Sequence, residues 1–281
     1  MIQDIAPKKL NNSYDPAAKV ENNSLIMVYK NGEFGVQIND VDGSLNYPRL
    51  SDFKHTDGME FIYLFSIDGE DFFLMQNVNT ITDLPSGYEF YNMRQLRSRE
   101  LLPRHYVFAA FTAFQLAEWY EGTVYCGKCG AKNVNSKTER ARVCPVCGKT
   151  VYPRINPAVI VGVTNGDKLL LTKYRTGFNH NALVAGFTEI GETMEETVSR
   201  EVMEEAGLKV KNIRYYKSQP WGIASDILMG FYCDVDGDDT ITMDESELKY
   251  AEWVQREDIL LQPMDYSLTN EMMTKFKEGL V

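Results

Sequence analysis

The feature that most constrains this 281-residue chain is an acidic segment, residues 186–208, whose glutamates follow helical spacing. Glu201, Glu204 and Glu205 stand at i, i+3 and i+4, which places three carboxylates on one face of a helix. Like charges at these spacings repel one another unless a cation lies among them. A site made only of carboxylate oxygens suits Mg²⁺ or Mn²⁺. The alternative interpretation of the segment is a solvated acidic helix without a metal.

The same segment predicts where the helix begins and ends. Thr193 with Glu196 three residues later has the pattern of a capping box, and Gly207 is suited to end the helix. Apolar residues at helical spacing predict the face that packs on the core: Val198, Val202 and Ala206.

Four of the five cysteines form two Cys-x₂-Cys pairs separated by fourteen residues: Cys126, Cys129, Cys144 and Cys147. This arrangement resembles a zinc ribbon, and four thiolates complete a tetrahedral zinc shell, so we expect one structural zinc per chain. Disulfides are the competing interpretation, but they suit secreted chains and no secretion signal is present. Cys233, in an apolar run, is predicted to be a buried core thiol.

Charge and hydropathy exclude some classes of function. The net charge of −11 argues against broad, charge-driven DNA binding, although it permits metal-bridged binding of a small anionic nucleotide. The N-terminal residues lack the apolar core of a signal peptide, and no apolar run approaches the length of a bilayer. We therefore expect a cytoplasmic protein without a membrane partner.

The sequence predicts three domains. Residues 1–121 are expected to form an α+β domain, with a frayed Asn-rich start, hairpin turns at Asn31-Gly32 and Asp68-Gly69, and an amphipathic helix over 104–120. Residues 122–154 are expected to form the zinc ribbon. Residues 155–281 are expected to hold strands near 158–163, 168–173, 182–185, 213–217, 227–235 and 249–254, and a helix near 270–278.

Residues 122–152 of the ribbon carry a cluster of positive charge against a single acidic residue, Glu139. These cations could contact a nucleic acid, or they could offset the negative charge of a zinc-tetrathiolate, which we favour. They are Lys128, Lys132, Lys137, Arg140, Arg142 and Lys149.

The acidic segment resembles the box of the Nudix hydrolases. The matching positions are Gly186, Glu192, the run Arg200-Glu201-Val202, the pair Glu204-Glu205 and the pair Gly207-Leu208. The resemblance implies an α/β/α sandwich with a mixed sheet on which the box helix packs. It also implies cleavage of a nucleoside-linked diphosphate by glutamates that hold two or more Mg²⁺ or Mn²⁺ ions.

A second motif, Ser218-Gln219-Pro220-Trp221, follows the box. Together with the ribbon it makes the chain similar to the NADH pyrophosphatases, also called NAD diphosphatases. That resemblance implies a homodimer that splits NAD(H) into nicotinamide mononucleotide and AMP, and it extends to removal of NAD caps from RNA.

The resemblance assigns roles residue by residue. It implies that Glu201, Glu204 and Glu205 hold the catalytic metals, that Arg200 orients them, and that Glu247 supports metal binding or proton transfer. Residues expected to bind substrate are Phe187, Tyr152, Gln219 and Trp221. The alternatives are core packing for the two aromatic rings of Phe187 and Tyr152, a solvent-facing Glu247, and a turn with a packed tryptophan at residues 218–221.

The chain departs from the family directly after Trp221. Gly222, Ile223 and Ala224 stand where the family has Pro-Phe-Pro, which predicts a looser loop and weaker discrimination between NADH and other ADP-containing diphosphates. A Nudix hydrolase of another nucleoside diphosphate, such as ADP-ribose, is the nearest alternative. A non-hydrolysing, nucleotide-sensing regulator is a more distant one, against which the complete glutamate set and the acidic net charge count.

Overall fold

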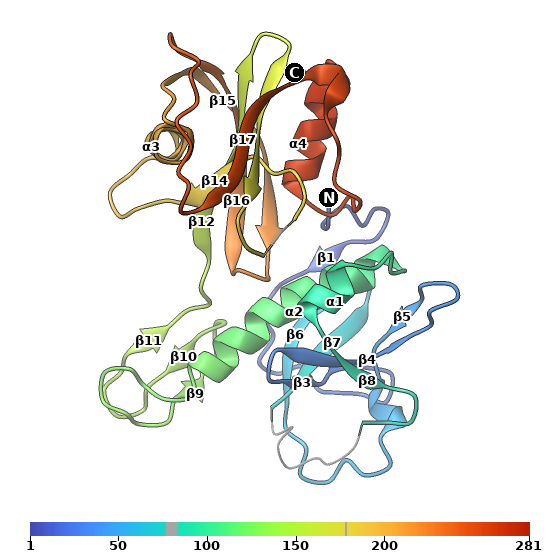
Figure 1. The fold of residues 1–281 in the computed structure, drawn as a ribbon. Helices are drawn as coiled ribbons and strands as arrows, with labels where there is room; N and C mark the ends of the chain where they lie inside the picture. The colour runs from blue at the N-terminus through green and yellow to red at the C-terminus, as the bar shows by residue number, and fades with distance from the viewer. Residues whose placement is uncertain (77–83, 178) are drawn as a thin grey trace. The chain divides into compact units, whose positions relative to one another are not determined.

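The computed structural model describes residues 1–76, 84–177 and 179–281, and its helices and strands divide into two compact units (Figure 1). The N unit comprises Gln3–Arg154 with Gly222–Ser225, and the C unit comprises Met1–Ile2, Ile155–Trp221 and Asp226–Val281.

Two small sheets form the first part of the N unit. One has the strand order β1 (Leu10–Asn11), β6 (Phe61–Ile67), β7 (Glu70–Met75) and β2 (Leu25–Met27). In the other, β4 (Glu33–Ile38) pairs with β3 (Tyr29–Lys30), β5 (Leu45–Asn46) and β8 (Glu89–Asn92). A short 3₁₀ helix, η1 (Leu50–Asp52), lies between β5 and β6.

Both predicted hairpin turns are present. Asn31 and Gly32 have φ of 52° and 83° and join β3 to β4, while Asp68 and Gly69 have φ of 50° and 82° and join β6 to β7. Positive φ at both central residues gives the turn whose twist matches paired strands. The sequence pattern was wrong in one respect: the apolar run before Asn31 divides into β2 and β3, which belong to different sheets.

Two helices and the ribbon complete the N unit. Helix α1 (Met93–Arg97) precedes α2 (Arg104–Gly122), which confirms the helix predicted over 104–120 and contacts β5 and β6. The ribbon follows as a three-stranded sheet ordered β11 (Thr150–Val151), β10 (Arg142–Val143), β9 (Val134–Asn135).

The C unit is built on a mixed sheet, as the sequence predicted. Its order is β15 (Val210–Trp221), β16 (Asp226–Val235), β12 (Asn156–Asn165), β13 (Lys168–Tyr174) and β17 (Leu248–Gln255), with β14 (Val184–Phe187) also paired to β12. The β12–β16 pair is parallel and the other pairs are antiparallel.

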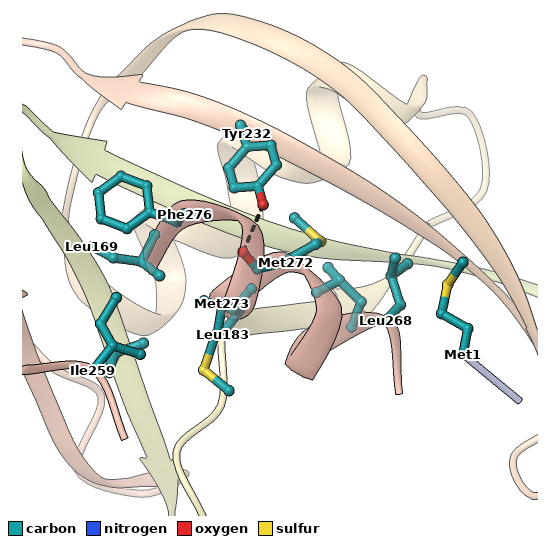
Figure 2. Packing of buried hydrophobic residues seen from close by; sticks show 11 residues of the cluster. Met1, Leu169, Leu183, Tyr232, Ile259, Leu268, Met272, Met273 and Phe276 are labelled. Atoms are coloured by element: carbon teal, nitrogen blue, oxygen red, sulfur yellow. Dashed lines mark hydrogen bonds between the residues drawn. The ribbon is translucent and has the colours of Figure 1, made fainter. Parts of the chain in front are cut away.

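Helices cover both faces of this sheet, which makes the C unit an α/β/α sandwich (Figure 1). Val198, Val202 and Ala206 of α3 (Met194–Ala206) pack on one face, so the predicted stripe is confirmed. On the other face α4 (Leu268–Lys277) packs through residues that include Met272 and Phe276 (Figure 2). The 3₁₀ helix η3 (Arg256–Asp258) follows β17 and precedes α4 in the chain.

The N-terminus is folded, which corrects the prediction of a frayed start. Met1 packs into the α4-side core of the C unit (Figure 2), and the backbone N–H of Ile2 donates to the Tyr266 carbonyl at 2.9 Å. Leu10 and Asn11 then pair with β6 in the N unit. The apolar residues Met1, Ile2 and Leu10 follow no periodic pattern that could have predicted these contacts.

Candidate active site

Helix α3 begins and ends where the sequence predicted, and these ends fix the direction of its acidic face. The Thr193 side chain accepts from the Glu196 N–H while the Glu196 side chain accepts from the Thr193 N–H. Gly207 ends the helix with φ of 70°, a left-handed conformation that glycine adopts without strain.

Arg200 organises the acidic face through five short hydrogen bonds. Its guanidinium donates to both Glu192 oxygens at 2.6 and 2.9 Å, and to single oxygens of Glu201 and Glu204 at 2.7 and 2.9 Å. It also donates to the Phe187 carbonyl at 2.8 Å. The hydrogen bond from Arg200 lowers the pKa of Glu192 to about 2. Arg200 therefore bonds to three glutamates of the segment, and Glu192 is its main partner.

Gly186 permits the closest contact in the site. A Cβ atom at this position would lie 2.0 Å from the Glu201 carboxyl group. Only glycine lets this carboxyl lie against the backbone of β14, which gives a physical reason for glycine at the start of the box.

Glu205 is the most deeply buried acid of the helix, with 3% of its surface exposed. One carboxyl oxygen accepts from the Ala185 N–H at 3.3 Å, and the other has no hydrogen-bond partner among the described residues. Burial, with the charges of Glu201, Glu247 and Asp244, raises the pKa of Glu205 to about 8. A buried carboxylate oxygen without a partner is costly unless a cation or a proton satisfies it, so the donor set fits a divalent metal.

A loop before β17 brings Glu247 to the same place. The N–H groups of Thr242 and Asp244 donate to the carbonyls of Ala206 and Glu205 at 2.8 and 3.0 Å, which ties the loop to the end of α3. The charge of Glu247 then contributes to raising the pKa of both Glu201 and Glu205. The structure thus brings Glu247 together with the helix glutamates, although its side chain remains exposed.

Sequence reasoning missed two residues of this cluster. Tyr174, the last residue of β13, has its pKa raised by burial and by the charges of Glu205, Glu247 and Glu201. Asp244 acts on Glu205 in the same way. Neither stands at a regular spacing from the box, so no local pattern could have indicated them.

The residues expected to bind substrate have different surroundings. Phe187 and Tyr152 are 53% and 57% exposed, so core packing is excluded for both. Phe187 lies in the C unit, where its ring is available to stack on a base. Tyr152 lies in the N unit, where its hydroxyl donates to Glu139 at 3.1 Å.

The surroundings of Gln219 do not support its predicted role in binding substrate. Its side chain is fully buried, its amide N–H₂ donates to the Tyr266 carbonyl at 2.7 Å, and its oxygen accepts from the Leu268 N–H at 2.7 Å. These bonds hold the start of α4 against β15. Residues 218–221 are therefore strand rather than turn, and Gln219 serves the fold.

Trp221 ends β15, opposite a second acid that sequence reasoning missed. It is half-buried and pairs with Asp226 of β16. Asp226 is 6% exposed, one of its oxygens lacks a partner among the described residues, and burial raises its pKa to about 6.

Gly222 packs against α2 within the N unit. A Cβ atom there would lie 2.0 Å from the Phe111 carbonyl oxygen, and the Ser225 N–H closes the turn on the Gly222 carbonyl at 3.2 Å. The Phe111 carbonyl leaves no room for a Cβ atom here, so steric fit favours glycine where the family has proline. The looser loop stays a prediction.

The four predicted zinc ligands converge. The Sγ atoms of Cys126, Cys129, Cys144 and Cys147 all lie within 4.8 Å of one another, and no disulfide joins them. The Cys126–Cys147 and Cys129–Cys144 separations are 3.7 and 3.5 Å. A tetrahedral site with zinc–sulfur bonds of about 2.3 Å has sulfur–sulfur edges of about 3.8 Å, so the cluster fits zinc. Cys233 is a buried thiol, as predicted.

Two of the ribbon's cations serve the fold. The Arg140 guanidinium donates to Asn12 at 2.6 Å and to the Leu64 carbonyl, and that of Arg142 donates to the Asn133 carbonyl at 3.0 Å. This leaves four exposed lysines, which weakens the case for a nucleic-acid surface made by all six cations.

Comparison with known families agrees with this geometry. Residues 154–276 match the NUDIX domain, and residues 123–152 match the NADH pyrophosphatase zinc ribbon domain. Among the described residues, no helix is both long and apolar enough to span a bilayer.

Similar proteins include two that are named NAD-capped RNA hydrolase NudC. The one from Shigella flexneri is 45% identical over 152 residues, which cover 53% of this chain and 58% of that protein. The one from Shigella dysenteriae serotype 1 (strain Sd197) is 41% identical over 162 residues, or 57% of this chain and 62% of that protein. The match thus spans less than two thirds of either relative.

Among solved structures, a NUDIX hydrolase from Nitrosomonas europaea is 22% identical and covers 55% of this chain and 90% of its own, with a TM-score of 0.48. By sequence, residues 123–152 are similar to the NADH pyrophosphatase zinc ribbon domain, and residues 154–276 are similar to the NUDIX domain.

Proposed function

We propose that this protein hydrolyses the diphosphate bond of NAD(H) in a metal-dependent reaction, giving nicotinamide mononucleotide and AMP. The observation that carries the proposal is the carboxylate cluster of Glu201, Glu205 and Glu247, in which a buried Glu205 oxygen lacks a partner among the described residues. The substrate class follows from the relatives and from the ribbon family.

The residues of the site have separate roles in the proposed reaction. Glu201, Glu204, Glu205 and Glu247 offer oxygen ligands to two or more Mg²⁺ or Mn²⁺ ions, which supply charge neutralisation and an activated water when bound. Arg200 keeps Glu201 and Glu204 aligned, which matters because phosphoryl transfer depends on positioning and charge more than on covalent help. The exposed Phe187 ring offers a stacking surface for a flat base, worth about 1–3 kcal/mol.

Rates with NADH, ADP-ribose and NAD-capped RNA in the presence of Mn²⁺ test the proposal. We expect NADH or NAD-capped RNA to be the best substrate, and Glu205→Gln to lower turnover by about 10² to 10⁴ because it removes a charged ligand at nearly constant volume. Glu204→Gln is expected to act in the same direction. Glu195→Gln is the matched control, since Glu195 is an exposed acid on the first turn of the same helix.

Two outcomes would count against the proposal. Near-normal hydrolysis by Glu205→Gln would remove the assigned role of the cluster. A clear preference for ADP-ribose would instead assign the protein to the alternative class, a hydrolase of another nucleoside diphosphate. Removal of NAD caps would not contradict the proposal. It would extend the substrate to RNA, as in the relatives' name.

We also propose that the chain has three domains, at residues 1–121, 122–154 and 155–281, and that the ribbon holds one structural zinc. Cys126→Ser should abolish zinc retention and unfold the ribbon, because the metal's binding free energy is folding free energy. Metal analysis of the purified chain checks this, and zinc-free protein with native ribbon structure would contradict it. A homodimer is proposed on the resemblance alone, and light scattering in solution tests it.

A further inference from the structure

Tyr174 is placed at the glutamate cluster by the backbone of two neighbouring strands. The pairing of β13 with β17 shifts between Lys173 and Tyr174, so that Tyr174 lies opposite Leu248, the residue next to Glu247. The N–H of Arg175 then donates to the Glu247 carbonyl at 2.9 Å. This hydrogen bond joins the residue directly after Tyr174 to Glu247.

The environment of the Tyr174 hydroxyl is unusual for a phenol. The charged side chains that act on it are those of Glu205, Glu247 and Glu201. At neutral pH a tyrosine hydroxyl is protonated. A protonated phenol can donate one hydrogen bond. Within the part of the chain that the structure describes, one buried oxygen of Glu205 has no hydrogen-bond partner, so it does not accept from this hydroxyl.

Beside carboxylates that bind cations, a neutral hydrogen-bond donor suits a phosphate better than a charged side chain would. When cations fill the cluster, the carboxylate oxygens become their ligands, and the diphosphate oxygens are drawn to the same place. A hydrogen bond to a charged oxygen is short and about twice as strong as a neutral one. The phenol can supply it without adding a charge that competes with the cations for the glutamates.

We propose that Tyr174 is a substrate-contacting residue of this site, whose hydroxyl donates a hydrogen bond to a phosphate oxygen of the dinucleotide held at Glu201, Glu205 and Glu247. This inference rests on the proposed diphosphate hydrolysis. It adds a tyrosine from β13 to a catalytic set that otherwise comes from α3 and the loop before β17.

Tyr174→Phe removes only the hydroxyl, and it should lower kcat/KM for NADH by about 10- to 100-fold at saturating Mn²⁺. The Mn²⁺ concentration that gives half-maximal activity and the melting temperature should change little, because the ring and the carboxylates remain. Tyr250→Phe is the matched control. Tyr250 lies on β17 opposite Lys173, and its hydroxyl interacts with Glu252, outside the cluster.

The measurement uses the full, zinc-loaded chain, with wild type and both variants assayed side by side. An active wild type with an equally active Tyr174→Phe would overturn the inference and leave the proposed function standing. So would a loss that excess Mn²⁺ restores, or an equal loss in Tyr250→Phe. An inactive wild type would instead reject the proposed function.

Discussion

At the scale of single residues, the candidate site is defined by a carboxylate that the protein alone does not satisfy. Glu205 is buried beside three other acids, and one of its oxygens has no partner among the described residues. The helix spacing predicted Glu201, Glu204 and Glu205 as a cluster. It could not predict Tyr174 or Asp244, because a strand register shift and a loop tied to α3 bring these residues in from distant parts of the chain.

The buried Glu205 makes the metal-free protein sensitive to pH. Its pKa is raised from an ordinary value of 4.5 to about 8, so the folded protein holds a proton that the unfolded chain has lost between these pH values. The free energy of unfolding should therefore fall as pH rises from about 4.5 through 8, apart from the contributions of other groups.

Glu205→Gln removes this penalty. In zinc-loaded protein without added Mg²⁺ or Mn²⁺, we expect the variant to be more stable than wild type at pH 8.5 by about 1–3 kcal/mol, and by much less near pH 4.5. Urea unfolding at the two pH values measures the difference. Glu204→Gln is the control, because the Glu204 side chain is 58% exposed. A destabilised Glu205→Gln at high pH would show that the carboxylate is satisfied in the protein itself.

At the scale of elements, local signals predicted most of what positions the site. The capping box, Gly207 and the apolar stripe gave α3 its ends and its buried face, and two-residue turns gave the hairpins. Contacts between segments far apart in sequence could not be read in the same way. Gln219 serves to hold α4, and Gly222 fits against Phe111, for reasons that only tertiary packing supplies.

The turn after Trp221 allows a sharper test of selectivity than restoring the whole family motif. Gly222→Pro or Gly222→Ala should destabilise the protein, because any Cβ at this position meets the Phe111 carbonyl. Ile223→Phe leaves that contact unchanged and adds only the missing ring. We expect it to raise kcat/KM for NADH relative to ADP-ribose by a factor on the order of ten or less.

Steady-state kinetics with both substrates, together with melting curves, checks these two effects. An unchanged ratio in folded Ile223→Phe would mean that position 223 does not set selectivity. A fully stable Gly222→Ala would contradict the packing argument.

At the scale of the whole molecule, the sequence predicted the order of parts: an N-terminal α+β region, a four-cysteine ribbon and a NUDIX domain. The sequence did not predict that the first residues of the chain are divided between the two compact units. Met1 and Ile2 belong to the C unit, whereas Gln3 onward belongs to the N unit. Two apolar residues before a long polar segment carry too little pattern to predict such a crossing.

The most direct test of the central claim is chromatographic identification of the products when zinc-loaded protein acts on NADH with Mn²⁺. We expect equal amounts of AMP and reduced nicotinamide mononucleotide from wild type, and a loss on the order of 10² or more in both products with Glu205→Gln. Release of free nicotinamide, or intact NADH after incubation with folded wild type, would contradict it.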